Sequence, residues 1–145
     1  MAEIIIRNKI ITHNYEILER YECGLELVGT EVKSIRAGKA NLKDSFVLIK
    51  NGEVLVKNTH ISPYEFGNRE NKEPLRDRKA LMHKSQIINL QSKIKQGGLT
   101  LIPSKIYFVG KWVKIEICLC KGKKTYDKRE DLKKKEAERN IKKYI

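Results

Sequence analysis

Glu31 and Lys33 have the spacing found in some metal-dependent nucleases, in which a carboxylate holds Mg²⁺ and a lysine orients the attacking water. Those sites place the pair on a strand, beside a second acidic residue. Here Thr30 is a candidate helix N-cap and Glu31 falls in an acidic first turn, so the pair is expected on a short helix. The sequence therefore favours a surface helix over a nuclease centre, and an enzyme is the least favoured class of function.

The histidines and cysteines do not show the spacing of a metal site. His13, His60 and His83 are scattered along the chain without an H-x-x-H or H-E-x-x-H pattern. Cys118 and Cys120 share one face of an expected strand, but two thiols do not complete a tetrahedral site. We therefore expect no metal and no cofactor, and we expect buried, unreactive thiols.

The charge of the chain points to a polyanionic partner. Lys and Arg number 31 against 18 Asp and Glu, a net charge of +13. Such an excess on a small domain favours RNA, DNA or an anionic membrane surface. Residues 1–120 hold 20 basic and 13 acidic residues, whereas residues 121–145 hold 11 and 5. This division, with the change in hydrophobic pattern, predicts a folded domain over 1–120 and a basic tail over 121–145.

Three groups of basic residues are candidates for phosphate contact. They lie around the first expected helix, after the long polar loop, and at the junction with the tail. The groups are Lys33, Arg36 and Lys39; Arg76, Arg78 and Lys79; and Lys121, Lys123 and Lys124. Aromatic residues make up only 7% of the chain, which suits structured RNA better than a single strand read by successive stacking.

The elements that must position these residues are mostly short strands. Alternation predicts a bent strand over 15–28, and Thr30 with Ala37-Gly38 brackets a short helix. Asn51-Gly52 between two apolar runs predicts a β-hairpin over 45–58 with a type I′ turn. Residues 63–76 are typical of a loop.

The second half of the chain continues this pattern. A short strand over 78–82 precedes a helix that Ser85 caps and Gly97-Gly98 ends. Pro103 interrupts a strand over 99–109, which predicts an edge position or a bulge. Residues 112–120 alternate regularly, with Val113, Ile115, Ile117 and Leu119 on one side.

Together these elements predict a mainly β fold. We expect a small antiparallel six-stranded β-barrel related to the oligonucleotide-binding fold, with two or three flanking helices and a basic C-terminal tail. No stretch approaches the ~20 apolar residues of a membrane-spanning helix, and the N-terminal MAEIIIRNK is too short for a signal peptide. The expectation is a cytoplasmic monomer with no membrane partner.

The segment from Gly29 to Leu42, GTEVKSIRAGKANL, closely resembles the signature of the SmpB family, the SsrA-binding proteins of bacterial trans-translation. Further segments match that family in order along nearly the whole chain. They are Tyr21-Glu22-x-Gly24, Asp44-Ser45, His60-Ile61-x-Pro63-Tyr64, Arg76-x-Arg78-Lys79, Ile102-Pro103, Gly122-Lys123-Lys124 and Asp127-Lys128-Arg129.

The resemblance implies an adaptor without catalytic activity. In that family the barrel binds the tRNA-like domain of transfer-messenger RNA and the complex enters stalled ribosomes. The tail, unstructured in solution, becomes helical in the empty mRNA channel near the decoding centre of the small subunit. Family positions important for RNA binding match Asn8, Glu22 and Leu81, of which Leu81 could instead belong to the core. Gly122-Lys123-Lys124 and Asp127-Lys128-Arg129 match tail motifs linked to ribosome engagement.

Some positions depart from the family pattern. Cys23, Ala80, Met82, Cys118 and Cys120 are swaps that a core accepts, whereas Lys72-Glu73 changes the long loop near its RNA-facing part. The alternative function is a structural ribosomal protein or another RNA-binding protein.

Overall fold

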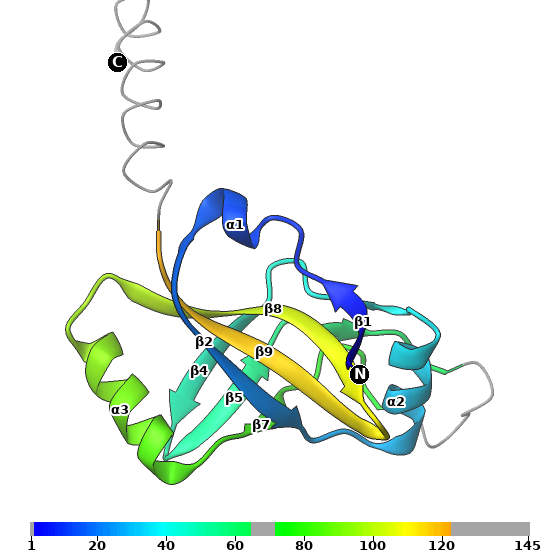
Figure 1. Cartoon of the computed structure of the whole chain (residues 1–145). Coiled ribbons are helices and arrows are strands. Elements are labelled where there is room, and N and C mark those ends of the chain that lie inside the picture. Colours follow the sequence, from blue (N-terminus) through cyan, green and yellow to red (C-terminus); the bar gives the residue numbers. More distant parts are fainter. Residues whose placement is uncertain (1, 65–71, 123–145) are drawn as a thin grey trace, which may run out of the picture.

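The computed structural model describes residues 2–64 and 72–122. Its strands, drawn in Figure 1, are β1 (Ala2–Arg7), β2 (Glu16–Leu25), β3 (Ala40–Asn41), β4 (Phe46–Lys50), β5 (Glu53–Lys57), β6 (His60–Ile61), β7 (Arg78–Leu81), β8 (Leu99–Val109) and β9 (Trp112–Lys121). Its helices are α1 (Ile11–Asn14), α2 (Gly29–Arg36) and α3 (Lys84–Lys95). The predicted motifs from Lys123 onward lie outside the described residues.

Six of these strands close into an antiparallel barrel. The sheet order is β1-β8-β4-β5-β7-β2-β9, and the further pairing of β8 with β9 completes the ring. β8 meets β4 only at Leu101 and pairs with β1 from Lys105 onward, so β1 is added outside the ring. This arrangement confirms the predicted fold class.

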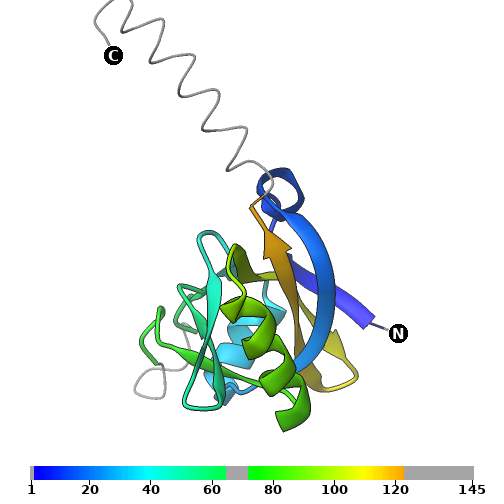
Figure 2. The same cartoon turned by 90° about the vertical axis from the view of Figure 1, so that its left-hand side faces the viewer.

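The core of the barrel follows from the alternation of its strands. Val113, Ile115, Ile117 and Leu119 of β9 are all buried, as their period of two predicts. α3 covers one end of the barrel with Ile87 and Leu90, and Figure 2 shows it from that side. α2 lies at the opposite end, where Ile35 is fully buried (Figure 1).

A second, smaller hydrophobic cluster lies on the outside of the barrel. Ile11 of α1, Ile102 of β8 and Cys118 and Cys120 of β9 form it. Both faces of β9 are therefore covered near its C-terminal end. Burial raises the pKa of Cys23 and of Cys120 to about 12. The prediction of buried, unreactive thiols agrees with this burial.

Two turn features predicted from the sequence are present. Asn51 and Gly52 both have positive φ angles, 53° and 76°, as a type I′ hairpin turn requires. The β8–β9 register shifts between Pro103 and Lys105, so Pro103 marks a bulge. Pro103 also lies between the part of β8 that faces β4 and the part that faces β1, where its missing N–H breaks no ladder.

Both predicted helix N-caps were wrong by two residues. The N-cap of α2 is Val28 rather than Thr30, and that of α3 is His83 rather than Ser85. Val28 has no polar side chain, and the Glu31 carboxylate instead accepts a hydrogen bond from its backbone N–H at 3.1 Å. No helix within residues 2–64 and 72–122 is long and apolar enough to cross a membrane.

Candidate nucleic-acid interface

The outward side of β8, β9, β2 and β7, called here the outer face, brings two of the predicted RNA-binding residues together. Because Cys23 and Leu25 of β2 point into the core, Glu22 and Gly24 point outward. Glu22 pairs in register with Glu116 of β9, and Gly24 pairs with Leu81 of β7. Glu22 and Leu81 therefore lie on neighbouring strands of one continuous surface.

The strand registers arrange the outer face in two rows of side chains. The Glu22 row is Lys105, Glu116 and Glu22, and the Leu81 row is Tyr107, Lys114, Gly24 and Leu81. Neighbouring strands lie about 4.8 Å apart, so the Leu81 row spans about 14 Å. In Figure 1 the strands β8, β9 and β2 of this face lie at the front.

Glu22 is an exposed carboxylate with an oriented partner. The Tyr107 hydroxyl donates a hydrogen bond to Glu22 Oε2 from the next row. Burial, and then this hydrogen bond, raise the pKa of Tyr107. The Glu22 carboxylate is thus held toward β8 with acceptor capacity left for an amino group or a ribose hydroxyl.

Glu116 faces Glu22 directly across the β2–β9 pair, and like charges in that position repel each other. Its carboxylate is neutralised by Arg20 Nη1 at 2.8 Å and accepts from Ser104 Oγ at 2.6 Å. Burial alone would raise the pKa of Glu116, but hydrogen bonds from Ser104 and Arg20 and the charge of Lys105 lower it. Glu116 is therefore ionised and internally compensated.

Leu81 belongs to the surface and not to the core. Half of it, 50%, is exposed, so the alternative of a core leucine was wrong. It packs over Gly24, where an added Cβ would meet Leu81 Cδ1 at 3.4 Å. The Leu81 side chain can therefore lie flat over the backbone of Gly24, which has no side chain of its own.

Asn8 lies beyond the other end of this face and uses its amide within the protein. Its Nδ2 donates to the Pro103 carbonyl at 3.0 Å, and its Oδ1 accepts from the Ile10 N–H at 3.3 Å. These bonds fix the β1–α1 connection to the bulge in β8. Asn8 therefore fixes the shape of the backbone at this end of the face. A ligand could still donate a hydrogen bond to the remaining lone pair of Asn8 Oδ1.

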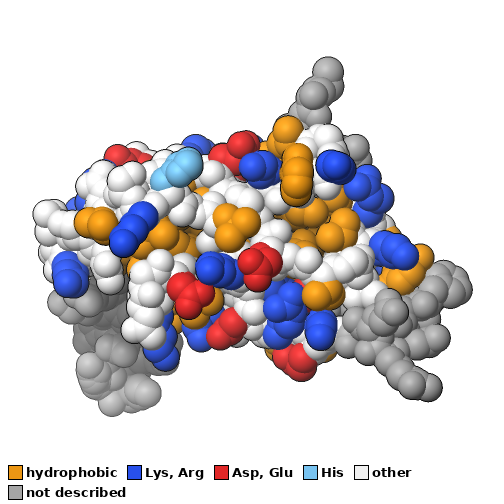
Figure 3. All heavy atoms as spheres, turned by 90° about the horizontal axis from the view of Figure 1, so that it is seen from below, with side chains coloured by type: hydrophobic (Ala, Val, Ile, Leu, Met, Phe, Trp, Pro, Cys, Tyr) orange, Lys and Arg blue, Asp and Glu red, His pale blue; other side chains and the backbone are white. Residues whose placement is uncertain are grey.

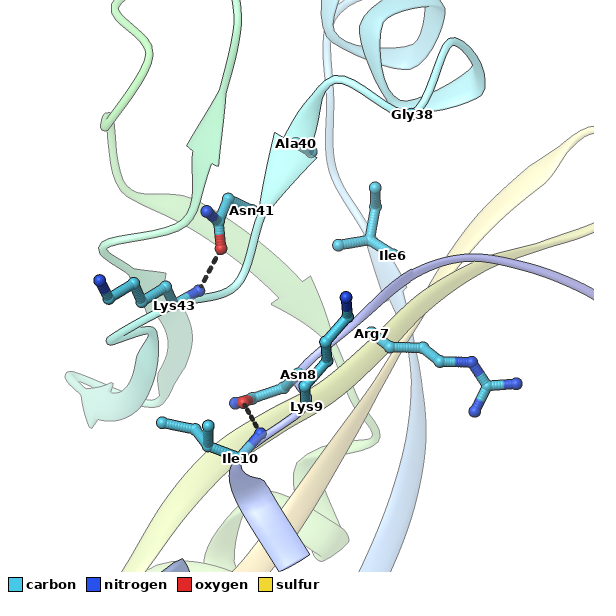
Figure 4. Close-up of a pocket in the computed structure, with 9 residues that line it drawn as sticks. All are labelled: Ile6, Arg7, Asn8, Lys9, Ile10, Gly38, Ala40, Asn41 and Lys43. Atoms are coloured by element: carbon cyan, nitrogen blue, oxygen red, sulfur yellow. Dashed lines mark hydrogen bonds between the residues drawn. The ribbon is translucent and has the colours of Figure 1, made fainter. Parts of the chain in front are cut away.

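A groove of about 450 Å³ opens beside Asn8. In Figure 4 the segment from Arg7 to Ile10 forms one side of it, and the segment from Gly38 to Lys43 forms the other. Arg7, Lys9 and Lys43 are the basic residues of its lining. The groove suits a phosphate backbone by its charge.

Residues 5–145 match a protein-family model described as SmpB protein. The chain belongs to the SmpB family. The SsrA-binding protein of Carboxydothermus hydrogenoformans is 57% identical over 145 residues, which cover 100% of this chain and 97% of that protein. The SsrA-binding protein of Desulforudis audaxviator is 58% identical over 137 residues, which cover 94% of this chain and 90% of that protein.

A solved structure of an SmpB protein has a similar fold. It is described as "tmRNA-SmpB: a journey to the center of the bacterial ribosome" and aligns with a TM-score of 0.69 at 47% sequence identity. The match covers 82% of this chain and 84% of that chain.

The first basic group of this SmpB chain lies on and after α2. Lys33, Arg36 and Lys39 are all exposed. The Arg36 guanidinium stacks 4.2 Å from the centroid of the Phe108 ring, which fixes its direction at the end of the barrel. This group adjoins the groove of Figure 4, whose lining includes Gly38 and Ala40.

The second basic group is divided by the alternation of β7. Lys79 is partly exposed and pairs with Glu53 at 3.2 Å, whereas Arg78 is 1% exposed. The Nε and Nη2 atoms of Arg78 donate to Glu31 Oε2 at 2.9 and 2.7 Å. Its remaining hydrogen bonds go to the carbonyls of Thr59 and Pro74. Burial thus argues against a direct phosphate contact by Arg78.

The expectation of a surface position for Glu31 was wrong, because Glu31 is only 4% exposed. Arg76 also binds it, with Nε at 3.0 Å from Oε2. Burial alone would raise the pKa of Glu31, but hydrogen bonds from Arg76, Val28 and Arg78 lower it. Glu31, Arg76 and Arg78, called here the Glu31 network, join α2 to the end of the long loop.

The sequence contained one signal for the Glu31 network. Ala80 is an apolar residue that a short strand would bury, and Arg78 precedes it by two, so both must point to the same side. The partner of Arg78, 47 positions away, had no local signal.

Proposed function

We propose that this chain is the RNA-binding adaptor of trans-translation. It binds the tRNA-like domain of transfer-messenger RNA and delivers that RNA to stalled ribosomes. The observation that carries this is the outer face, on which Glu22 and Leu81 lie on neighbouring strands in a chain of the SmpB family. Its SsrA-binding relatives and the solved tmRNA-SmpB structure support the same reading.

The chemistry of the outer face fits a structured RNA. Lys114 supplies positive charge, while Glu22 and Leu81 supply an acceptor and an apolar contact. A carboxylate repels phosphate but accepts hydrogen bonds from base amino groups and 2′-hydroxyls. Such a face discriminates by shape and edge contacts as well as by charge. The adaptor needs no cofactor and performs no catalysis, and it acts in the cytoplasm.

The test compares binding to the tRNA-like domain with binding to an ordinary tRNA over a range of salt concentrations. We expect tighter binding to the tRNA-like domain, reduced by Glu22→Gln and by Leu81→Ala. Leu48→Ala is the matched control, because Leu48 is 45% exposed on β4, outside the outer face. Equal, weak and strongly salt-dependent binding to both RNAs would refute the proposal.

The tail has a separate role in this proposal. Gly122-Lys123-Lys124 and Asp127-Lys128-Arg129 engage the ribosome, with the tail in the empty mRNA channel near the decoding centre. Truncation after Gly122 leaves β9 whole. The truncated protein should bind the tRNA-like domain normally and fail to act on stalled ribosomes. If the truncated protein lost RNA binding, this division of roles between barrel and tail would be contradicted. If the full-length protein were bound to all ribosomes at full occupancy, a structural ribosomal protein would be favoured.

A further inference from the structure

A groove of about 420 Å³ lies at one end of the outer face, between the turn that joins β8 to β9 and the end of β7. Trp112 and Leu81 contribute its apolar walls and are 65% and 50% exposed. Lys111, Lys114 and Glu26 are the charged residues of its lining. Figure 3 shows the molecule from below, where hydrophobic side chains gather on the surface with charged ones beside them.

The groove continues the Leu81 row. Lys114, Gly24 and Leu81 follow one another in register across β9, β2 and β7, and Trp112 points outward two residues before Lys114. Gly24 keeps the space between the walls open, because a Cβ there would occupy it at van der Waals distance from Leu81. The exposed indole and the exposed leucine therefore form a small apolar surface with polar groups beside it.

The charges of the groove select the kind of partner. Lys111 Nζ lies 5.6 Å from the centroid of a Trp112 ring, and Lys114 contributes a second ammonium group to the lining. A flat apolar surface with cations beside it fits a nucleobase, which stacks on the indole while its phosphates meet the lysines. Glu26 can accept a hydrogen bond from an exocyclic amino group on the base edge.

We propose that this groove binds one unpaired nucleobase of the RNA, stacked on Trp112 and in contact with Leu81, with Lys111 and Lys114 at the adjacent phosphates. The inference rests on the proposed function and names a nucleobase as the ligand at one end of the outer face. It also makes Trp112 a specificity residue, since a base inside a duplex is already stacked on both sides and does not enter.

Trp112 is the sole tryptophan of the chain, so its emission reports directly on the groove. We expect the tRNA-like domain to quench this emission as it binds. Trp112→Ala should weaken binding by about 5- to 150-fold, the equivalent of the roughly 1–3 kcal/mol that stacking of one base contributes. Trp112→Phe should retain part of the affinity, and Leu48→Ala should stay within about twofold of the wild type.

Circular dichroism during thermal unfolding should show equal stability for these variants, because Trp112 and Leu48 are both exposed. Unchanged emission on binding, together with normal affinity of Trp112→Ala, would overturn the groove proposal while leaving the adaptor function intact. If the wild type does not prefer the tRNA-like domain over tRNA, the adaptor function fails. In that case the groove proposal is tested with a short single-stranded oligonucleotide and with the same strand in a duplex. Quenching of the Trp112 emission by the single strand alone supports the groove proposal, and no quenching by either refutes it.

Discussion

Replacing Glu31 by glutamine should cost this protein a large part of its stability. The Glu31 carboxylate accepts hydrogen bonds from Arg76, from Arg78 and from the Val28 N–H while only 4% exposed. Glutamine removes the negative charge and leaves Arg78, itself 1% exposed, without the carboxylate that its Nε and Nη2 atoms bind. Removal of one partner from a buried ion pair typically costs about 3–5 kcal/mol, so Glu31→Gln should unfold at a Tm roughly 10–20 °C lower.

The matched control is Glu53→Gln. Glu53 also pairs with a cation of β7, Lys79, but both side chains are about half exposed, at 51% and 42%. An exposed pair contributes little, so this variant should stay within about 0.5 kcal/mol of the wild type. Denaturant unfolding followed by far-ultraviolet circular dichroism measures both.

A double-mutant cycle separates the network from general damage. Glu31→Gln leaves the Arg78 cation without the carboxylate that it binds, and Arg78→Gln removes that cation. The double variant should therefore be more stable, by about 0.5–3 kcal/mol, than the sum of the two single losses predicts. Additive losses, or a Glu31→Gln effect as small as that of Glu53→Gln, would refute the claim that Glu31 holds two guanidinium groups.

The pH dependence of the same variants follows from the lowered pKa of Glu31. A carboxyl group whose pKa is lower in the folded state than its ordinary value of 4.5 stabilises the fold fully above that value. This contribution is lost as the pH falls through the folded-state pKa. The gap in unfolding free energy between the wild type and Glu31→Gln should therefore be constant near neutral pH and shrink in acid.

Two further predictions concern the fold. Gly52→Ala should destabilise the β4–β5 hairpin by about 1 kcal/mol, because Gly52 has a φ of 76°; Gly29→Ala, where nothing lies within 4 Å of an added Cβ, is the control, and an equal effect of both in chemical denaturation would be contrary evidence. The thiols of Cys23, Cys118 and Cys120 should react with a thiol reagent near pH 8 only as fast as the protein opens, because burial raises their pKa; rapid labelling of the native protein would show that this burial is incomplete.

The sequence predicted those elements whose signals are local. Asn51-Gly52 specifies its own turn, and the alternation from Val113 to Leu119 is strong enough to set both the strand and its inward face. β1 and α1 were not predicted, since α1 has four residues and no side-chain cap. They form because β1 pairs with the second half of β8 and α1 covers Cys118 and Cys120. These partners are distant in the sequence, so local sequence patterns do not predict the contacts.

The candidate site was predicted as a set of residues but not as a surface. Family resemblance supplied Glu22 and Leu81, yet their proximity depends on the β2–β7 and β2–β9 registers. Basic composition alone placed Arg78 with Lys79, although consecutive residues of a strand point to opposite sides. When basic residues follow one another on a strand, the side to which each one points must therefore be established before any of them is assigned to a ligand.

The arrangement of charge also limits how the interface recognises RNA. Arg78 and Arg76 bind Glu31, and Arg20 and Lys105 surround Glu116, so two carboxylates offset part of the charge of four cations within the protein. The slope of binding affinity against salt counts the phosphates neutralised, at about 0.9 per contact on a double strand. The slope for residues 1–120 should therefore be smaller than their 20 basic residues would give if each met a phosphate. Because Glu22 is exposed on the outer face, an RNA that offered only phosphates would meet repulsion there. We therefore expect the preference for one RNA to depend on its shape and base edges, to which Glu22 and Leu81 can offer an acceptor and an apolar contact.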